Sequence, residues 1–461
     1  MNKENLFNKA PLFLQNLMIS LFNIIVYYKR YGGLYKKHLL DFENKQNISL
    51  SRLKQIQEIK FQQLLQHTIS NSNFYNEKYS NLKLPKSINE ISLLPIINKE
   101  ELRKNINEVY TLSKNKGLVS KTGGTTGKSL EVIFTKKDTQ ERFAMLDNFR
   151  SQFGYKLGKK TAWFSGKNLL NEKDIKKNRF WKTDYLYKVR YYSTFHINDN
   201  YLKYYLRDLI EFKPKFMIGF PSSMSEIAKY GIRNNINFPK NIIKAIFPTA
   251  ETITPEIREV LTTYFHTQVY DQYASSEGAP FIFECKNHNL HLELQSGVFE
   301  VLDNDDKPAN EGRLVITSFT THGTPLIRYD IGDEIVLSDK TCNCGNNNPL
   351  VKMINGRIDD YIYSPENGKI NLGNISNTLK NVQGVQKFQA IQDVLNEIII
   401  KIVIDKNKFN DNAKSTFISN WRDRIGTKMN IKLEIVDKIK PEKSGKYRMV
   451  KNNIKHLVDI L

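Results

Sequence analysis

The chain has 461 residues, of which 40% are hydrophobic and 25% are charged, a composition that excludes an intrinsically disordered chain and predicts two or three domains. Three cysteines exclude a disulfide framework and are typical of a reducing compartment. The net charge of +21 favours anionic partners, but the basic residues are scattered and no nucleic-acid-binding motif occurs, so we expect no nucleic-acid partner.

An uncharged apolar segment covers residues 11–28 and is followed by Lys29 and Arg30. It lacks the small-residue cleavage site of a signal peptide and only just reaches the length of a transmembrane span. One polar stripe recurs on it at helical spacing: Asn16, Ser20 and Asn23. Three interpretations stay open: a helix docked on the main domain, a peripheral membrane helix through residues 11–30, or a true span. We expect a cytoplasmic protein, with peripheral contact to the inner face of the plasma membrane as a further hypothesis.

Helix and strand patterns follow in chain order. Apolar residues at three-to-four spacing predict a helix over residues 50–80. From about residue 117 strands alternate with helices, which predicts an α/β fold with a parallel-rich sheet and crossover helices. The predicted strands are residues 215–218 and 242–247, and the predicted helices are residues 221–232 and 255–265. The candidate N-caps are Ser222 or Ser223 for the first helix and Thr252 or Thr254 for the second.

The pattern becomes strand-rich after about residue 290 and changes again after Gly356. The final part predicts a small α+β module behind a hinge near residue 359. We therefore predict a helical lead packed on the main domain over residues 1–110, the remainder of a large α/β domain over residues 111–358, and a small mobile domain over residues 359–461.

A run of glycines and hydroxyl residues covers residues 120–129, Ser-Lys-Thr-Gly-Gly-Thr-Thr-Gly-Lys-Ser. The glycines let backbone N–H groups turn toward an anion, and the hydroxyls and Lys128 add donors. The run nearly matches the P-loop pattern, but Thr122 stands where the first glycine is required. It predicts a phosphate site, and a plain hairpin turn is the alternative.

Four further segments carry candidate chemistry: residues 271–278, 325–333, 356–360 and 443–448. The first falls at the predicted end of a strand, where Tyr273 can stack on a purine and Glu277 can hold Mg²⁺ against a phosphate. Asp333 follows a glycine turn and can accept the two ribose hydroxyls. Lys446 lies on a glycine turn and can carry positive charge to reacting oxygens. Taken alone, the segment of residues 271–278 has a turn with an exposed glutamate as its alternative.

In this order, the five segments resemble the adenylate-forming ligases, and most closely the phenylacetate–CoA ligase-like branch with its CapK-type members of polysaccharide biosynthesis. The resemblance covers nearly the whole chain. Ala274 and Ser276 depart from it, because they replace the Gly and Thr of the family's Tyr-Gly-x-Thr-Glu motif.

The resemblance implies that a carboxylic acid reacts with MgATP to an acyl-adenylate and pyrophosphate. Glu277 would hold Mg²⁺, Lys446 and Arg357 would act with it in catalysis, and Asp359 would be the hinge. The implied nucleotide-binding residues are Thr122, Gly123, Gly124, Thr125, Thr126, Gly127, Lys128, Asp271, Tyr273, Ser276, Asp333 and Arg357. The candidate acyl-pocket residues, named from their place beside predicted strands, are Ser165, Gly219, Phe220 and Pro221.

The acceptor of the acyl group stays open. An amine of an amino acid or sugar would give an amide, which suits capsule or O-antigen biosynthesis with a sugar nucleotide or glycan as partner. The thiol of CoA would make the protein an acyl-CoA ligase. A catalytically idle membrane-associated binding protein is a third interpretation. The sequence does not predict an oligomeric state.

All three cysteines fall in two short segments, one with Cys285 and His291 and the other with Cys342 and Cys344. Three thiolates and an imidazole would form a closed tetrahedral zinc site, which is structural because no position stays open for chemistry. Related ligase-like proteins carry a similar cluster. His288 is an alternative fourth ligand, and ordinary buried cysteines are the alternative to any metal.

Overall fold

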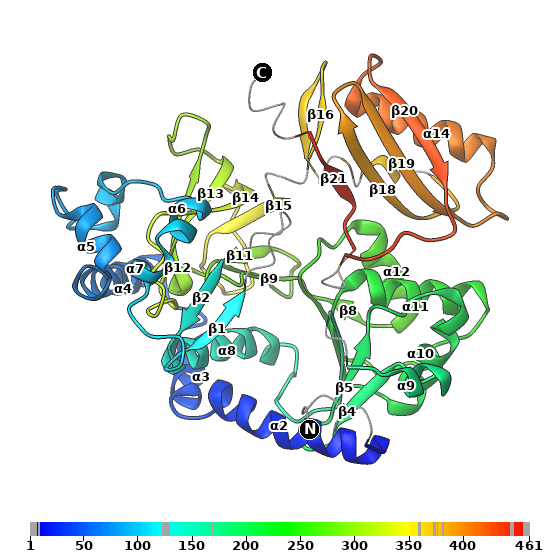
Figure 1. Ribbon diagram of the computed structural model, residues 1–461, viewed down its shortest axis with the longest axis horizontal. Helices are drawn as coiled ribbons and strands as arrows, with labels where there is room; N and C mark the ends of the chain where they lie inside the picture. The colour runs from blue at the N-terminus through cyan, green and yellow to red at the C-terminus, as the bar shows by residue number, and fades with distance from the viewer. Residues whose placement is uncertain are drawn as a thin grey trace. The chain divides into compact units, whose positions relative to one another are not determined.

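The computed structural model describes residue 7 and residues 10–121, 130–166, 169–357, 361–371, 375, 377–379, 382–442 and 447–454. The chain divides into two compact units, which are described separately (Figure 1). The first comprises Met1–Glu300, Val315–Ile331 and Ser338–Val351, and the second comprises Val301–Leu314, Gly332–Leu337 and Lys352–Leu461. The predicted domain limits stay predictions, and the one near residue 359 falls outside the described residues.

A six-stranded sheet forms the centre of the first unit. Its strands lie in the order β4, β5, β3, β6, β7 and β8, and every neighbouring pair is parallel except the antiparallel pair β4 and β5. Their bounds are β3 Thr161–Ser165, β4 Trp181–Asp184, β5 Val189–Ser193, β6 Phe216–Gly219, β7 Ala245–Pro248 and β8 Gln268–Val269. The predicted parallel-rich α/β fold is confirmed.

Helices cover both faces of this sheet. The bounds are α3 Tyr35–Asn44, α8 Lys136–Ser151, α9 Glu172–Lys176, α10 Asp199–Phe212, α11 Pro221–Arg233 and α12 Pro255–Phe265. Met217 and Ile246 face the core shared with α10, α11 and α12. Their neighbours Ile218 and Phe247 face the core shared with α3 and α8. Because both faces are buried, β6 and β7 are apolar throughout, as is typical of parallel strands.

A seven-stranded sheet has the order β12, β13, β14, β15, β11, β10 and β9. Its strands are β9 Gln272–Ala274, β10 Phe281–Glu284, β11 Leu290–Leu292, β12 Gly297–Leu302, β13 Glu311–Ser318, β14 Tyr329–Ser338 and β15 Leu350–Arg357, with the 3₁₀ turn η2 Leu294–Ser296. Phe281 and Phe283 of β10 share the core of α8 and α3, so α8 lies between the two sheets. A separate antiparallel hairpin joins β1 Leu118–Lys121 and β2 Glu131–Phe134.

The N-terminal part of the first unit is helical, with α2 Leu12–Tyr31, α4 Leu50–Asn71, α5 Asn73–Tyr79, η1 Ile88–Leu93, α6 Lys99–Lys104 and α7 Ile106–Val109. The helix predicted over residues 50–80 is interrupted at Ser72, which adopts an extended backbone and separates α4 from α5. α2 meets the length and hydropathy criteria for a membrane span.

The C-terminal part of the second unit is an α+β module, as predicted. It has a four-stranded sheet in the order β20, β19, β18 and β21, a hairpin of β16 and β17, and helix α14. The bounds are β16 Tyr361–Ser364, β17 Gly368–Asn371, η3 Asn377–Leu379, β18 Val385–Val394, β19 Glu397–Ile404, α14 Asp411–Ile425, β20 Asn430–Ile435 and β21 Val450–Asn452. Phe417 and Trp421 of α14 are buried against the sheet.

One predicted helix cap is wrong. α11 begins after Phe220 with Pro221 in its first turn, and neither Ser222 nor Ser223 is the N-cap. The Glu251 carboxylate instead accepts hydrogen bonds from the backbone N–H of Ser222 at 3.1 Å and from its Oγ at 3.0 Å. A residue distant in sequence thus satisfies the first turn of the helix. Thr254 caps α12 as predicted, by accepting from the N–H of Ile257.

Asp147 on α8 makes stability depend on pH. Its carboxylate accepts from Tyr35 Oη at 2.9 Å, and burial raises its pKa to about 6 although Arg150 and Tyr35 act in the opposite direction. The contribution of this carboxyl group to the free energy of unfolding is therefore full below the unfolded pKa of about 4 and is lost as the pH rises through about 6. We expect the free energy of unfolding of Asp147→Asn, relative to that of the wild type, to rise by up to about 3 kcal/mol between pH 4 and pH 8. Urea unfolding measures this, and a pH-independent difference would contradict the assignment.

Candidate functional site

Glu277 lies in the turn that follows β9. Its side chain is buried, with the residue 4% exposed, and Oε2 accepts a hydrogen bond from Ser275 Oγ at 2.8 Å. The backbone N–H of Glu277 donates to the same Oγ at 3.0 Å. Ser275 therefore fixes the carboxylate in one orientation. Ser276 is exposed beside it, and Tyr273 on β9 is half-buried.

Arg142 on α8 supports this turn, and the sequence motifs did not reveal it. Its guanidinium donates to the carbonyl oxygen of Ser275 at 2.8 Å and lies 4.3 Å from the ring centre of Phe134. Burial lowers its pKa to about 10, while the carboxylates of Asp138 and Glu277 act in the opposite direction. The group thus stays protonated at neutral pH and supplies a fixed positive charge beside Glu277.

Gly278 completes the turn at a position where only glycine fits. Its φ is +92°, and a Cβ atom there would lie 2.5 Å from Thr321 Cγ2 and 2.7 Å from Ser318 Oγ. Thr320 Oγ1 also donates to the Gly278 carbonyl at 2.9 Å. The end of β13 and the loop that follows it, residues 318–325, therefore pack directly on the turn that carries Glu277.

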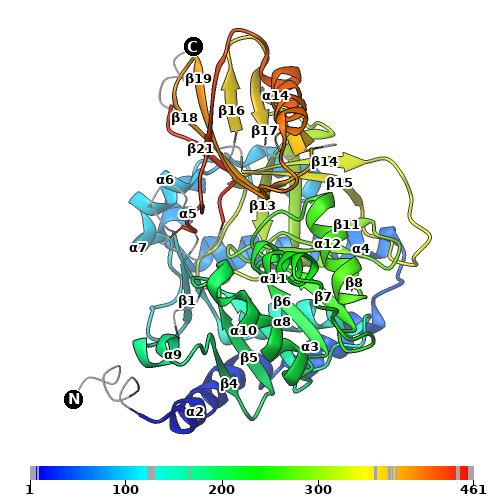
Figure 2. The ribbon, with the colours of Figure 1, turned by 90° about the vertical axis from the view of Figure 1, so that its right-hand side faces the viewer.

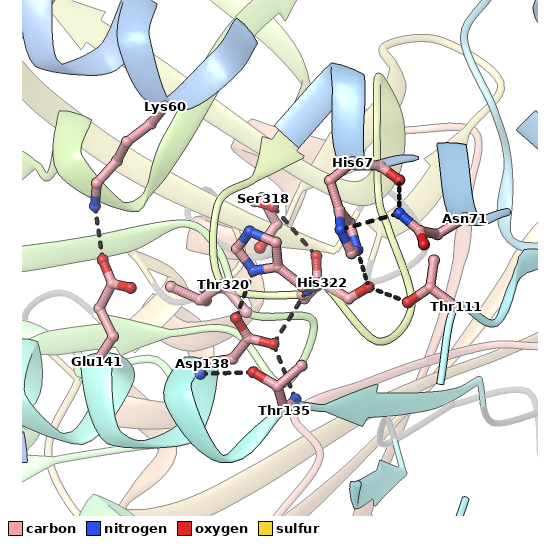
Figure 3. A network of polar contacts seen from close by, with 12 residues as sticks. Lys60, His67, Asn71, Thr111, Thr135, Asp138, Glu141, Ser318, Thr320 and His322 are labelled. Carbon is pink, nitrogen blue, oxygen red and sulfur yellow. Dashed lines mark hydrogen bonds and ion pairs between the residues drawn. The ribbon is translucent and has the colours of Figure 1, made fainter. Parts of the chain in front are cut away.

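A polar network holds the segment of residues 318–325 in place (Figure 3). Asp138, fully buried in the first turn of α8, lies 2.6 Å from His322 Nδ1 through Oδ1 and accepts the His322 N–H at 3.1 Å through Oδ2. Asp138 also forms a capping box with Thr135. The His322 carbonyl accepts from Thr111 Oγ1 at 2.5 Å and lies 3.1 Å from His67 Nε2. α8 thus supports the Glu277 turn through Arg142 and through this network.

We expect Asp138→Ala to lower the free energy of unfolding by about 2–4 kcal/mol, because it leaves two backbone N–H groups and the His322 ring without their buried acceptor. Glu141→Ala, one turn along α8, is the matched control. Its 2.7 Å ion pair with Lys60 is partly exposed, so it should cost only about 1 kcal/mol. Chemical unfolding checks both variants, and equal losses would contradict a special role for Asp138.

The glycine-rich residues Thr122 to Lys128 lie outside the described part of the chain. Their flanking strands β1 and β2 form a hairpin, and the base of this hairpin contacts residues 318–325. The N–H of Ile133 donates to Thr324 Oγ1 at 2.8 Å, and a Cβ on Gly323 would lie 2.6 Å from the Ile133 carbonyl oxygen. One segment therefore contacts both the hairpin that carries the candidate phosphate loop and the turn of Glu277.

The other predicted site residues are placed as follows. Asp271 lies between β8 and β9, where burial and the neighbouring Glu284 carboxylate raise its pKa to about 6. Asp333 is buried on β14 and belongs to the second unit. Arg357 ends β15, and its side chain is outside the described part, as are Asp359 and Lys446.

The four candidate acyl-pocket residues lie at carboxyl ends of central strands. Ser165 ends β3, Gly219 ends β6, and Phe220 and Pro221 lead into α11. Gly219 has a φ of +134°, and a Cβ there would lie 1.8 Å from the Phe164 carbonyl oxygen. This glycine is required by the close approach of β3 and β6, and that packing role is independent of any acyl group.

The predicted zinc ligands lie together in the first unit. Cys285, His291, Cys342 and Cys344 place one ligand atom each within 4.8 Å of one another. Cys285 Sγ lies 3.8 Å from Cys342 Sγ, and Cys344 Sγ lies 3.4 Å from His291 Nε2. A tetrahedron with Zn–S bonds of about 2.3 Å has S···S edges of about 3.8 Å, so the donor set fits zinc.

The surroundings select His291 over His288 as the imidazole of this cluster. The carbonyl of Asn348 lies 3.1 Å from His291 Nδ1, which leaves Nε2 toward the three sulfurs, and burial lowers the pKa of His291. His288 Nδ1 instead lies 2.8 Å from Glu284 Oε1. Zinc binding itself stays a prediction.

Comparison with known proteins places the chain in a family. The CapK C-terminal domain family matches residues 362–453. Protein CapK of Staphylococcus aureus is 34% identical over 455 residues, which are 98% of this chain and 99% of that protein. The chain belongs to the CapK family. Phenylacetate-coenzyme A ligase of Thermus thermophilus is 27% identical over 160 residues, or 33% of this chain and 36% of that enzyme.

Solved structures show the fold of this CapK family member. One match is a 2-hydroxyisobutyryl-CoA ligase that was solved in its postadenylation state in complex with R3-HIB-AMP. Its TM-score is 0.71 and its sequence identity is 16%, over 90% of this chain and 92% of that chain. The same ligase with 2-HIB-AMP and CoA in an open conformation matches with a TM-score of 0.57 and 17% identity over 88% and 92%. The CapK family chain therefore has the fold of an adenylate-forming acyl-CoA ligase, and the predicted fold class and family are confirmed.

Proposed function

We propose that this CapK family protein is an AMP-forming carboxylate ligase. A carboxylate oxygen of the substrate attacks the α-phosphorus of ATP and pyrophosphate leaves, which yields the acyl-adenylate. A nucleophile then attacks the acyl carbon and AMP leaves. The observation that carries the proposal is the buried Glu277 carboxylate, fixed by Ser275 in a turn that shares its support with the base of the glycine-rich hairpin.

Each predicted residue has a role in this scheme. Glu277 would hold Mg²⁺, which would neutralise phosphate charge, and Thr122 to Lys128 would bind the phosphates through backbone N–H groups, hydroxyls and a lysine. Tyr273 stacks on the adenine, with Asp271 and Ser276 beside it, and Asp333 binds the ribose. Arg357 contacts the nucleotide, Lys446 stabilises the developing charge, and Asp359 is the pivot between the two steps.

We further propose an amine as the acceptor, in the biosynthesis of a capsule or O-antigen polysaccharide, with a sugar nucleotide or glycan as partner. The full-length similarity to Protein CapK supports this choice. CoA is the second candidate, because the ligase that shares the fold was solved with CoA bound. We place the protein in the cytoplasm.

Pyrophosphate release with MgATP across a panel of carboxylic acids tests the proposal. The panel contains phenylacetate, short acyl acids, amino acids and uronic acids, each with and without CoA or amines. Pyrophosphate release that requires a uronate and an amine, and that does not depend on CoA, supports the amide ligase. CoA-dependent turnover of an aryl or acyl acid supports the CoA ligase. Failure to bind ATP would reject both and would favour an idle binding protein.

Glu277→Gln should raise the Mg²⁺ concentration required for half-maximal pyrophosphate release by about tenfold or more, because a neutral amide replaces a charged ligand at unchanged volume. The hydrogen bond from Ser275 can persist to the amide oxygen, so the melting temperature should change little. Glu259→Gln, at an exposed position of α12, is the control. An unchanged Mg²⁺ requirement in Glu277→Gln would remove this residue from the metal site.

A further inference from the structure

Helix α2 has its polar side against the protein and its apolar side toward solvent, the reverse of an ordinary surface helix. Its buried residues are Gln15, Asn16, Ser20, Asn23 and Tyr27. Its exposed large apolar residues are Phe13, Leu14, Leu17, Leu21, Phe22, Ile24, Ile25 and Tyr28. No charged residue occurs between Leu12 and Tyr28. Both ribbon views show α2 alongside β4 of the six-stranded sheet (Figure 1, Figure 2).

Specific hydrogen bonds fix this orientation. Asn16 Oδ1 accepts the backbone N–H of Thr183 at 3.1 Å, and Ser20 Oγ accepts that of Tyr185 at 2.9 Å. Asn23 Nδ2 donates to the buried carboxylate of Asp184 at 2.6 Å. Rotation of the helix about its axis would break all of these contacts and would bury the apolar face against a polar strand edge. The outward apolar face is therefore built into the fold.

The outward face extends onto the hairpin of β4 and β5, where Tyr185 and Leu186 are also exposed. An apolar surface of this kind on a water-soluble domain marks a contact with a partner or a membrane. Tyr28 is an exposed aromatic residue with a polar tip, the residue type enriched at membrane interfaces. The hydroxyl of Tyr185 instead accepts a hydrogen bond from Asn16 Nδ2 at 3.0 Å, so this tyrosine belongs to the contact that docks α2.

Basic residues stand at both ends of α2. Lys29 and Arg30 lie in its last turn, and the exposed Lys36 and Lys37 follow in α3. At the other end, a cavity of about 320 Å³ beside Gln15 is lined by the basic residues Lys173, Lys177 and Arg179 and by Asp174, whose carboxylate lies 3.7 Å from the Arg179 guanidinium. A protein surface would have to supply matching acidic patches at both ends, whereas an anionic bilayer supplies negative charge uniformly.

We propose that α2 lies in the headgroup region of an anionic lipid bilayer, with its axis along the membrane surface and its apolar face inserted. A spanning orientation is disfavoured, because it would draw the buried Lys182–Asp174 ion pair and the polar edge of β4 into hydrocarbon. The contact is independent of the ligase reaction.

Flotation of the full chain with lipid vesicles tests this proposal. We expect co-flotation with phosphatidylcholine vesicles that contain roughly 30% phosphatidylglycerol, and weaker binding to pure phosphatidylcholine or at high salt. Phe22→Gln/Ile25→Gln changes residues that are 66% and 60% exposed, so the fold should persist while the partition coefficient falls by about tenfold or more. Val394→Gln/Ile435→Gln, exposed by 52% and 57% in the second unit, is the matched control and should bind normally.

Three outcomes would overturn the proposal. The first is equal flotation of the Phe22→Gln/Ile25→Gln variant and the wild type. The second is a wild type that does not bind anionic vesicles but sediments as a dimer, together with a Phe22→Gln/Ile25→Gln variant that sediments as a monomer. A second copy of the chain would then cover the apolar face. The third is resistance to alkaline extraction from the vesicles, which indicates a span. Thermal melting and ATP binding confirm that the variants are folded.

Discussion

Lys446→Ala should lower the rate of pyrophosphate release by on the order of 10²–10³-fold while ATP binding and the melting temperature stay close to those of the wild type. The negative charge on the carboxylate and α-phosphate oxygens is redistributed only as the reaction proceeds. A lysine that contacts these oxygens during the reaction stabilises the transition state more than it stabilises bound ATP. Stopped-flow pyrophosphate release, combined with nucleotide titration, separates these two effects.

Lys440→Ala is the matched control for this experiment. Lys440 is an exposed lysine of the same C-terminal stretch, and its loss also lowers the net charge by one. It should leave the rate unchanged. A rate for Lys446→Ala equal to that of Lys440→Ala would reject Lys446 as the adenylation lysine. Parallel losses of rate and ATP affinity would instead assign it to ground-state binding.

Disruption of the predicted zinc site should have the largest effect on stability. We expect one zinc per chain, and we expect Cys344→Ser or a strong chelator to remove it and to lower the free energy of unfolding by about 4 kcal/mol or more. The four donor groups lie within 4.8 Å of one another and come from β11, the end of β10 and the segment before β15. Without a cation, no metal–ligand bonds hold these three parts of the chain together. Elemental analysis and urea unfolding are the measurements.

Asn343→Ser, an exposed position in the same turn, is the control and should keep both metal and stability. Metal content would separate a structural zinc from ordinary cysteine packing. Wild-type protein without zinc, at full stability, would reject the site. Because the four donors leave no open position, chelation should act on activity only through unfolding.

Much of the fold could be predicted because periodicity is a local property. The buried strands β6 and β7 and the capped helix α12 are contiguous, strongly patterned segments, and their limits agree with the prediction to within a few residues. The cap of α11 could not be predicted, since the acceptor is Glu251, almost thirty residues further along the chain.

In the candidate site, too, local motifs could be predicted and long-range contacts could not. Glu277 and the cysteine cluster could be named as candidates because short motifs contain them. Arg142, Asp138 and His322 could not, because their roles depend on how α8 packs between two sheets. A basic residue and an acidic residue in a helix are usually exposed, and no spacing rule marks Asp138 as buried or Arg142 as half-buried.

The docking of α2 also bears on solubility. Strand β4 is the last strand of the six-stranded sheet, and an uncovered edge strand is a template for pairing with other chains. Asn16 and Ser20 occupy two N–H groups at or just beyond this edge, those of Thr183 and Tyr185. The helix thus covers the edge of the sheet while it exposes its own apolar face. A truncated chain that begins after residue 31 would lose this apolar face but would expose the edge of β4 to pairing with other chains.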